Sequence, residues 1–321
     1  MAITMIWWIP PHRQFYVFAR AVLFLCLRTM KMFLRVIAIS KGFIIKTPVL
    51  TVGMATYNDY DGVYFSVQAL RMYHPEVMDQ VKILVIDNKP DSPHGEEVKR
   101  FIESYVENGR YVPFTEWESS FVKGQVFEHA QCEYVLCIDC HVLLVPGALA
   151  KLISYYNTFP NTRDLLQGPL VHDDLQNFYT HFEPKWQEQM FGTWATAQPS
   201  LDKGDPFEIP MQGCGLFSCK KEHWVGFNPA FRGFGGEEWY LQEKVRKQGG
   251  KVLCMPFLKW LHRFGRPDKP KYPLDMYARI RNFIIGWTEI YENKEHEAVQ
   301  SIVNHFIEQG YEEEKIRSYL E

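Results

Sequence analysis

The sequence predicts an α/β fold with a mostly parallel central sheet and helices on both faces. From about residue 47 onward, apolar strand-like runs alternate with amphipathic helical stretches. The runs are continuously apolar, which is typical of strands that are covered on both faces. At 321 residues and 46% hydrophobic content, the chain is also large and apolar enough to bury such a core.

The first elements follow one another at the spacing of strand, helix, strand units, in which long crossovers join parallel strands. We expect strands over residues 47–55, 81–86, 111–114 and 133–138. We expect the connecting helices over residues 63–73, 95–108 and 122–130.

The second half of the chain is less regular. Residues 157–210 are rich in Pro, aromatic and polar residues with little periodicity, which predicts a long substrate-facing segment. We expect a helix over 237–248 and an apolar strand over 251–261. After Phe283 the pattern is that of a polar amphipathic helix, which we interpret as a surface packing element.

The N-terminus has an unusual charge balance, since residues 1–58 carry seven Lys or Arg and no Asp or Glu. Charges interrupt its apolar runs before they reach the roughly 18 to 20 residues of a membrane-spanning helix. Residues 1–46 therefore fit a basic amphipathic extension in a membrane interface, and no small-residue cleavage site marks a secretory signal. A helix docked on the chain's own core, or a poorly ordered leader, is the alternative.

The seven cysteines are an odd number, and most lie in apolar, strand-like stretches. This pattern predicts reduced, buried thiols rather than a disulfide framework. The formal net charge of -3 gives no general argument for nucleic acid or an anionic membrane as a partner. We therefore predict a cytoplasmic protein, with peripheral membrane contact through residues 1–46.

Polar residues follow three of the expected strands. They are Thr56, Tyr57, Asn58, Asp87, Asn88, Asp139, Cys140 and His141. In open parallel sheets, ligands bind beyond the carboxyl ends of the strands. The sequence thus predicts that the chemistry lies along this edge of the sheet.

Asp139 and His141 are separated by one residue at the end of an extended segment, so their side chains lie on the same side. A carboxylate and an imidazole placed in this way can share a divalent cation, and the mixed oxygen and nitrogen set suits manganese better than calcium. The strand expected over 251–261 ends at His262, which offers a third ligand.

Glycines and a pair of acids mark a second candidate region. Gly213 lies in the stretch QGCGLFS, and Glu237 and Glu238 follow FRGFGG. Glycines beside paired carboxylates let the backbone approach a ligand closely while the acids point into a cleft. The alternative is a glycine turn that precedes a helix with favourable acids at its N-terminus.

These residues carry a resemblance to a known family. The stretches GCGLFSCKKEHW and GFGGEEWYLQEKVRKQGGKVLCMPFLKWLHRFGR resemble the catalytic half of polypeptide N-acetylgalactosaminyltransferases and the broader family 2 glycosyltransferases. TVGMATYNDYDG, KILVIDN and FEHAQCEYVLCIDCHVLL look like the nucleotide-binding half of the same GT-A fold. The resemblance covers roughly residues 47–270. It implies a GT-A catalytic domain over 47–285, after the 1–46 extension and before a C-terminal helical segment over 286–321.

The resemblance also implies roles for individual residues. Asp139, His141 and His262 would hold Mn²⁺, with Mg²⁺ as the alternative, and the metal would bridge the diphosphate of a UDP-sugar. The remaining donor contacts would come from Thr56, Tyr57, Asn58, Asp87, Gly213, Arg263 and Arg266. The metal would stabilise the charge that develops on the leaving diphosphate.

The chain departs from the family pattern at Glu238, where N-acetylgalactosaminyltransferases typically have Asn and retain the anomeric configuration. Inverting GT-A enzymes often place an acid there as general base. Glu237 is a neighbour that can raise the pKa of such a base. We therefore expect inversion with Glu238 as base, and a retaining mechanism is the alternative. No lectin-like repeat follows the catalytic region.

The expected reaction is transfer of a hexose or N-acetylhexosamine to a glycan, a lipid-linked glycan or another hydroxyl acceptor. Residues 244–281 carry eleven Lys or Arg, which fit a solvated helix face, an anionic lipid or a polyanionic acceptor such as DNA. A metal-dependent nucleotidyltransferase or phosphohydrolase is a rival hypothesis, as is a non-catalytic sugar-binding module. The glycine-acid segment argues against a hydrolase, which has no evident use for it.

Overall fold

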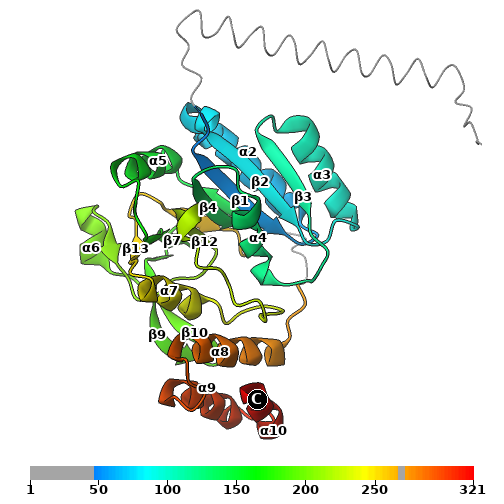
Figure 1. Cartoon of the computed structure of the whole chain (residues 1–321). Helices are drawn as coiled ribbons and strands as arrows, with labels where there is room; N and C mark the ends of the chain where they lie inside the picture. The colour runs from blue at the N-terminus through cyan, green and yellow to red at the C-terminus, as the bar shows by residue number, and fades with distance from the viewer. Residues whose placement is uncertain (1–46, 267–271) are drawn as a thin grey trace, which may run out of the picture. The chain divides into compact units, whose positions relative to one another are not determined.

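An eight-stranded mixed sheet lies at the centre of the computed structural model, which describes residues 47–266 and 272–321 (Figure 1). The order of its strands is β11-β13-β6-β12-β4-β1-β2-β3. They are β1 (Leu50–Thr56), β2 (Val81–Asp87), β3 (Gly109–Pro113), β4 (Tyr134–Asp139), β6 (Leu165–Gln167), β11 (Phe207–Glu208), β12 (Leu216–Lys220) and β13 (Val252–Cys254).

Four neighbouring strands of this sheet, β4, β1, β2 and β3, are parallel to one another. They correspond to the four strands expected in the first half of the chain, with ends shifted by up to three residues. β12 runs antiparallel to both β4 and β6, whereas β6 and β13 are parallel. The mostly parallel sheet is therefore confirmed, with β12 as a strand that the sequence analysis had read only as a glycine segment.

Helices cover both faces of the sheet, as predicted. The apolar cluster on one face includes residues of α2 (Tyr60–Tyr73), α3 (Pro93–Tyr105) and α5 (Ala148–Thr158). The cluster on the other face includes residues of α4 (Lys123–His129) and α7 (Glu238–Lys247). Side chains alternate along each strand, so Ile83 belongs to the first cluster and Leu84 to the second.

The single strand expected over 251–261 is wrong. The structure divides this segment into β13 and β14 (Trp260–His262), which belong to different sheets. Pro256 lies between them and has no N–H to donate to a strand ladder. β14 joins a four-stranded sheet of order β5-β14-β7-β8, whose other strands are β5 (Val142–Leu144), β7 (Leu170–Val171) and β8 (Phe178–Tyr179).

Residues 157–210 contain more regular structure than their sequence predicts. They hold β6, β7 and β8, the hairpin of β9 (His181–Gln187) and β10 (Met190–Ala195), and the short helix α6 (Gln198–Lys203). Strands of two or three residues are too short to produce a periodic pattern, and the hairpin has a register shift between Phe191 and Thr193. Their pairing is therefore set by contacts that the local sequence does not encode.

Three helices end the chain where the sequence predicts polar amphipathic helix. They are α8 (Met276–Tyr291), α9 (Glu297–Glu308) and α10 (Glu313–Arg317). Their apolar sides form a cluster of their own, and Trp186 and Phe191 of the β9–β10 hairpin pack against it. The proposed domain boundary between residues 285 and 286 falls inside α8.

The proposals for the N-terminal extension, residues 1–46, lie outside the described residues. In the part of the chain that is described, no helix combines the length and hydrophobicity needed to cross a bilayer. The six cysteines of that part are buried and free, as expected for reduced thiols.

The contact between β1 and α4 depends on the absence of a side chain at Gly53. A Cβ atom on Gly53 would lie 2.2 Å from Cγ1 of Val126. We predict that Gly53→Ala lowers the free energy of unfolding by about 1 to 3 kcal/mol, because the helix must move or Val126 must leave its rotamer. Urea unfolding followed by circular dichroism measures this loss.

Gly124→Ala, on the same helix, is the matched control. Its added Cβ would meet only Phe227, at 3.5 Å, which is an ordinary contact. Alanine also has a higher helix propensity than glycine, so this variant should be as stable as the wild type or slightly more stable. Equal losses in the two variants would contradict the packing argument.

Candidate functional site

The register of the parallel strands brings the predicted polar residues to one edge of the sheet. Thr56 pairs with Asp87, and Ala55 pairs with Asp139, at the carboxyl ends of β1, β2 and β4. The edge identified from the sequence is therefore a continuous row in the structure, as expected for a ligand site in an open sheet.

Asp139, His141 and His262 come together at this edge. The two Nε2 atoms of His141 and His262 are 3.1 Å apart, and His262 Nε2 is 3.5 Å from Asp139 Oδ2. One potential ligand atom from each residue lies within 4.8 Å of the others. Two imidazole nitrogens that each bind a metal at about 2.1 Å, nearly at a right angle, are about 3 Å apart. The donor set and its spacing thus fit a divalent cation.

The pairing of β14 with β5 explains how His262 reaches this position. His262 lies opposite Val142 in the antiparallel register, next along the chain to His141. The backbone N–H of Arg263 also donates to the His141 carbonyl, at 3.1 Å. Burial lowers the pKa of His141, although Asp59 and Asp139 oppose this effect. The neutral imidazole, which is the form that binds metals, is therefore favoured.

Lys123 is a site residue that the sequence analysis did not identify. Its Nζ lies 2.6 Å from Asp139 Oδ1 and 3.0 Å from the Cys214 carbonyl oxygen, to which it donates. Burial alone would raise the pKa of Asp139, but Lys123 and His262 outweigh it and hold this pKa well below its usual range. Asp139 is therefore an anion at neutral pH. No local pattern marks a lysine in the first turn of a helix as its partner.

A cavity of about 170 Å³ lies beside these residues. Asp139, His262 and Lys123 line it together with Glu237 and Glu238. Much of the remaining wall is aromatic or apolar, and it includes Phe182, Met190, Phe191, Trp194, Phe234, Trp260, Phe264 and Phe283. Gly213 also lines the cavity, as predicted for a backbone that approaches a ligand.

The two acids stand where α7 begins. Glu237 is 4% exposed, and its Oε2 has no hydrogen-bond partner within residues 47–266 and 272–321. Burial and the neighbouring Glu238 raise the pKa of Glu237 to about 8. Burial also raises the pKa of Glu238. The cavity therefore contains two carboxyl groups that tend to keep or take up a proton.

Asn282 of α8 supports the loop that carries these acids, and sequence reasoning missed it. Its amide Nδ2 donates to the carbonyls of Arg232 and Gly235, at 2.7 and 3.0 Å, and its Oδ1 accepts from the Arg232 N–H. Gly235 and Gly236 have φ angles of 89° and 96°, which favour glycine. A side chain on Gly236 would also approach Asn282 Cβ to 3.0 Å. An asparagine in a long helix gives no sequence signal for this role.

The loop after β1 holds the residues predicted to contact a nucleoside. Tyr57 donates to Glu118 Oε2 at 3.0 Å, and Thr56 Oγ1 donates to the Asp59 carbonyl at 3.4 Å. Asn58 has a φ of 51°, and its Oδ1 is buried with no hydrogen-bond partner in the part of the chain that is described. This free acceptor is a place where a ligand could bind.

Asp87 is fully buried below this loop. Its two oxygens accept from the Tyr111 hydroxyl and the Lys89 N–H, both at 2.9 Å. Burial raises the pKa of Asp87, and these two hydrogen bonds oppose the rise. A direct contact between Asp87 and a nucleoside would have to exchange or share one of these hydrogen bonds.

Arg263 and Arg266 lie at the same edge, and each is paired with an acid. Arg263 Nη2 is 2.8 Å from Asp61 Oδ2, and Arg266 Nη2 contacts Asp59 Oδ2. Arg263 Nη1 and Arg266 Nε are buried without partners among the described residues. Both guanidinium groups thus keep a donor that an anionic ligand could accept.

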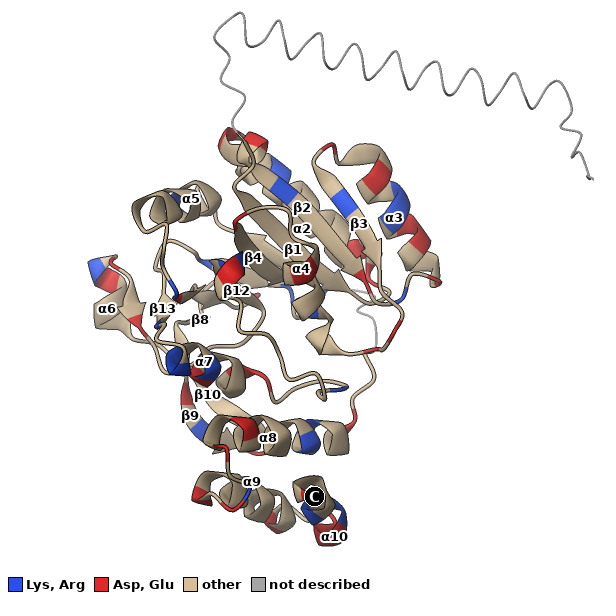
Figure 2. Ribbon diagram, viewed as in Figure 1, with Lys and Arg blue, Asp and Glu red and all other residues tan. Residues whose placement is uncertain are grey.

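Several basic residues of the stretch over 244–281 form ion pairs with acidic residues. Figure 2 shows acidic residues beside the basic ones on α7 and α8. Lys244 pairs with Glu289, Lys247 with Glu292 and Arg246 with Glu243, in addition to the pairs of Arg263 and Arg266. Much of its charge is therefore compensated by acids from inside and outside the stretch.

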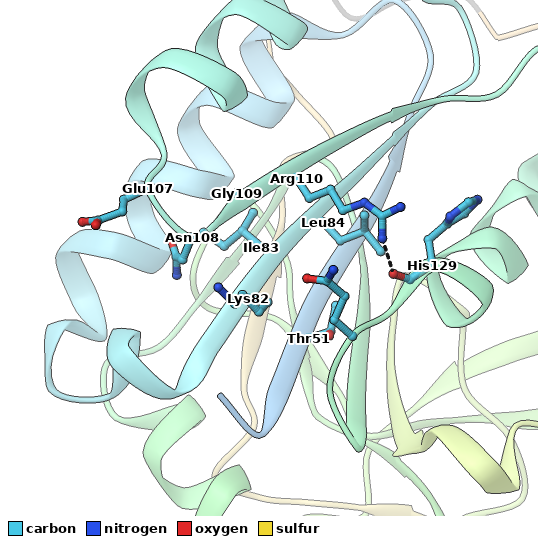
Figure 3. Close-up of a pocket in the computed structure, with 10 residues that line it drawn as sticks. Thr51, Lys82, Ile83, Leu84, Glu107, Asn108, Gly109, Arg110 and His129 are labelled. Atoms are coloured by element: carbon cyan, nitrogen blue, oxygen red, sulfur yellow. Dashed lines mark hydrogen bonds between the residues drawn. The ribbon is translucent and has the colours of Figure 1, made fainter. Parts of the chain in front are cut away.

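A smaller cavity of about 60 Å³ lies at the amino ends of β1, β2 and β3 (Figure 3). Thr51, Lys82 and Arg110 line it, and Arg110 donates to the His129 carbonyl at 2.9 Å. These strand ends are opposite those that carry Thr56 and Asp87. This cavity is thus separate from the candidate site.

Comparisons with known proteins support the fold. No family model matches the chain. A curated relative, polypeptide N-acetylgalactosaminyltransferase 5 of Rattus norvegicus, is 24% identical over 126 residues, which are 36% of this chain and 14% of that protein. The crystal structure of GalNAc-T7 with UDP, GalNAc and Mn²⁺ is 15% identical with a TM-score of 0.61 over 76% of this chain and 48% of that one. The chain thus matches less than half the length of either protein.

Two further solved structures are similar. The mannosyltransferase PcManGT from Pyrobaculum calidifontis, in complex with GDP-Man and Mn²⁺, is 13% identical, with a TM-score of 0.52 over 85% of this chain and 74% of that one. S. aureus TarS 1–349 in complex with UDP-GlcNAc is 11% identical, with a TM-score of 0.51 over 81% of this chain and 73% of that one. The chain has the GT-A fold of glycosyltransferases, and the fold prediction is confirmed.

Glu237 makes the stability of the protein depend on pH. Burial and the neighbouring Glu238 raise the pKa of its carboxyl from the ordinary value of 4.5 to about 8. Between these values the unfolded chain has lost the proton and the folded chain has not, so stability falls as pH rises, by up to about 1.4 kcal/mol per unit. We predict that Glu237→Gln makes this fall shallower, since only the share of Glu238 remains, and that it stabilises the protein more at pH 8 than at pH 5.

Urea unfolding with chelator present, at pH 5 and pH 8, measures this difference. Glu243→Gln is the control, because Glu243 lies on the same helix but is paired with Arg246. Its free energy of unfolding should change between pH 5 and pH 8 as that of the wild type does. Parallel pH profiles for wild type and Glu237→Gln would show that Glu237 is ionised throughout, contrary to the prediction.

Proposed function

We propose that the chain is a metal-dependent glycosyltransferase that moves a sugar from a UDP-sugar to a hydroxyl acceptor. One observation carries this proposal: Asp139 and His262 line the same cavity as Glu237 and Glu238. A ligand set for a metal diphosphate and a pair of acids with raised pKa values thus meet within one site. In the proposed transfer, the cation stabilises the leaving diphosphate and a carboxylate takes the proton of the attacking acceptor hydroxyl.

Asp139, His141 and His262 would hold the cation, with Mn²⁺ preferred over Mg²⁺ because two of the three ligands are imidazoles. When bound, the metal supplies Lewis-acid stabilisation of the leaving diphosphate. Lys123 would keep Asp139 ionised and in place, since the two side chains are 2.6 Å apart. Arg263 Nη1 and Arg266 Nε, which have no partner among the described residues, would bind diphosphate oxygens.

Thr56, Tyr57, Asn58 and Asp87 would hold the nucleoside at the ends of β1 and β2. The buried Oδ1 of Asn58, which has no hydrogen-bond partner in 47–266 and 272–321, supports this role, because a nucleoside donor would satisfy it. Gly213 would let the backbone approach the donor. The bound nucleotides of GalNAc-T7, PcManGT and TarS support a nucleotide sugar as the donor class.

Glu238 would act as general base toward the acceptor hydroxyl. The hydroxyl oxygen then forms the new bond to the anomeric carbon, its proton passes to Glu238, and the bond to the diphosphate oxygen breaks. Burial raises the pKa of Glu238 toward neutrality, which improves proton transfer at physiological pH. Attack from the face opposite the diphosphate inverts the anomeric configuration. The aromatic wall of the cavity, with Trp194 and Phe191, suits the apolar face of a sugar acceptor.

The metal requirement is tested by the release of UDP from a panel of UDP-sugars. We expect Mn²⁺ to support release and excess EDTA to abolish it. Asp139→Asn and His262→Ala should each lower the rate by at least about 100-fold, because a lost ligand removes several kcal/mol of charge stabilisation. His94→Ala, a change at an exposed histidine of α3, should leave the rate unchanged.

Full turnover in excess EDTA would contradict the metal site. Release of UMP and a sugar phosphate, instead of UDP, would contradict glycosyl transfer and indicate a phosphohydrolase or nucleotidyltransferase.

The role of Glu238 is tested with p-nitrophenyl glycosides as acceptors. We predict that Glu238→Gln lowers the transfer rate by roughly 10²- to 10⁴-fold and leaves UDP affinity unchanged, since the amide keeps the shape but cannot accept a proton. Glu243→Gln on the same helix is the control and should transfer normally. A product of retained configuration by NMR, or near-normal transfer by Glu238→Gln, would exclude Glu238 as the base.

A further inference from the structure

Asp59 is a buried acid that the candidate site has not yet used. It lies between β1 and α2 and is 4% exposed. Its Oδ1 accepts from the Gly62 N–H at 2.8 Å and so caps the N-terminus of α2. One oxygen of the carboxylate therefore has an ordinary structural role.

The second oxygen, Oδ2, faces three groups from other parts of the chain. It contacts the Arg266 guanidinium and lies 3.6 Å from Cys140 Sγ and 3.7 Å from His141 Nδ1. Helix capping requires none of these contacts. The carboxylate thus joins the loop after β1, the end of β4 and the segment after β14.

His141 is placed so that its two ring nitrogens face different partners. Nδ1 lies 3.7 Å from Asp59 Oδ2 and 3.5 Å from Cys140 Sγ, whose S–H is directed to the same Asp59 oxygen, whereas Nε2 is 3.1 Å from His262 Nε2. A neutral imidazole carries one N–H and one free lone pair. A carboxylate near Nδ1 favours the proton on that atom, which leaves the Nε2 lone pair for a metal. Loss of a group that hydrogen-bonds the other ring nitrogen of a metal-binding histidine typically weakens metal affinity by about 10- to 100-fold.

We propose that Asp59 is a positioning residue of the metal centre, which orients His141 for coordination through Nε2 and holds Arg266 beside the same centre. This inference rests on the proposed function, because it assumes that Asp139, His141 and His262 bind a cation. Asp59, Cys140 and His141 also form a group of possible ligand atoms, but both oxygens of Asp59 are already engaged, by the Gly62 N–H and by Arg266, so we assign Asp59 the positioning role.

The charge of Asp59 is consistent with this role. Burial alone would raise its pKa, but His141, the Gly62 N–H and Arg266 outweigh burial and lower it to about 2. Asp59 is therefore an anion at neutral pH, surrounded by donors. An anion so placed attracts the N–H of His141 more strongly than a neutral oxygen would.

Asp59→Asn separates the positioning role from the capping role. Asparagine is as good an N-cap as aspartate, so α2 keeps its cap, while the charge that faces His141 and Arg266 is lost. Asp61→Asn is the matched control. It removes a carboxylate two residues away, which pairs with Arg263 and makes no ion pair with His141 in the described residues.

The experiment is a titration of the full-length chain with Mn²⁺, followed by the EPR signal of the free ion. We expect the Kd of Asp59→Asn to rise about 10- to 100-fold and that of Asp61→Asn to stay near the wild-type value. Circular dichroism should show the same helix content in all three proteins. Equal Mn²⁺ affinity of wild type and Asp59→Asn would overturn the inference and leave the metal site itself intact.

A wild-type chain that does not bind Mn²⁺ would instead contradict the proposed function, and this inference with it. If Asp59→Asn does not fold, the positioning role is tested by determining which ring nitrogen of His141 carries the proton in the wild-type chain. Two-bond ¹H–¹⁵N spectra of histidine-labelled protein, assigned with His141→Gln, should place the proton on Nδ1. A proton on Nε2 would overturn the positioning role.

Discussion

The antiparallel pairing of β14 with β5 is the constraint on which the candidate site depends. It sets His262 opposite Val142 and so brings it to His141, from which it is separated by 121 residues in sequence. The parallel sheet alone presents Thr56, Asp87 and Asp139 at one edge. Of these, only Asp139 belongs to the proposed metal ligands. The small second sheet supplies His262, because its strand β5 follows β4 along the chain and pairs with β14.

Charge compensation is the second requirement of this site. Asp139 with Lys123 and Asp59 with Arg266 form two ion pairs near its centre. A charge removed from water is costly unless it is paired, and Lys123 and Arg266 supply that pairing for Asp139 and Asp59. The pairs of Arg263 and Arg266 also explain why the basic stretch over 244–281 does not form a free cationic surface.

The C-terminal helices contribute to the site instead of only covering the surface. Asn282 of α8 binds the backbone of the glycine-acid loop through three hydrogen bonds. Phe283, also of α8, lines the cavity, and Phe191 of the β9–β10 hairpin packs on the C-terminal cluster and lines the same cavity. The position of Glu237 and Glu238 thus depends on residues more than 40 positions farther along the chain. Both of the α8 residues that do this, Asn282 and Phe283, lie before the boundary expected at residue 286.

Local sequence determined the strands of the parallel half, the polar residues at their ends and the pair Asp139 and His141, because each depends only on the hydrophobic pattern of a few neighbouring residues. The resemblance to glycosyltransferases then added roles for Gly213, Arg263, Arg266 and Glu238. Only the tertiary structure decided that 251–261 is two strands, that residues 157–210 supply several short ones, and that Lys123, Asn282 and Asp59 support the site. Each of these depends on a pairing or a buried contact between distant segments, whose energy comes from partners that no local window contains.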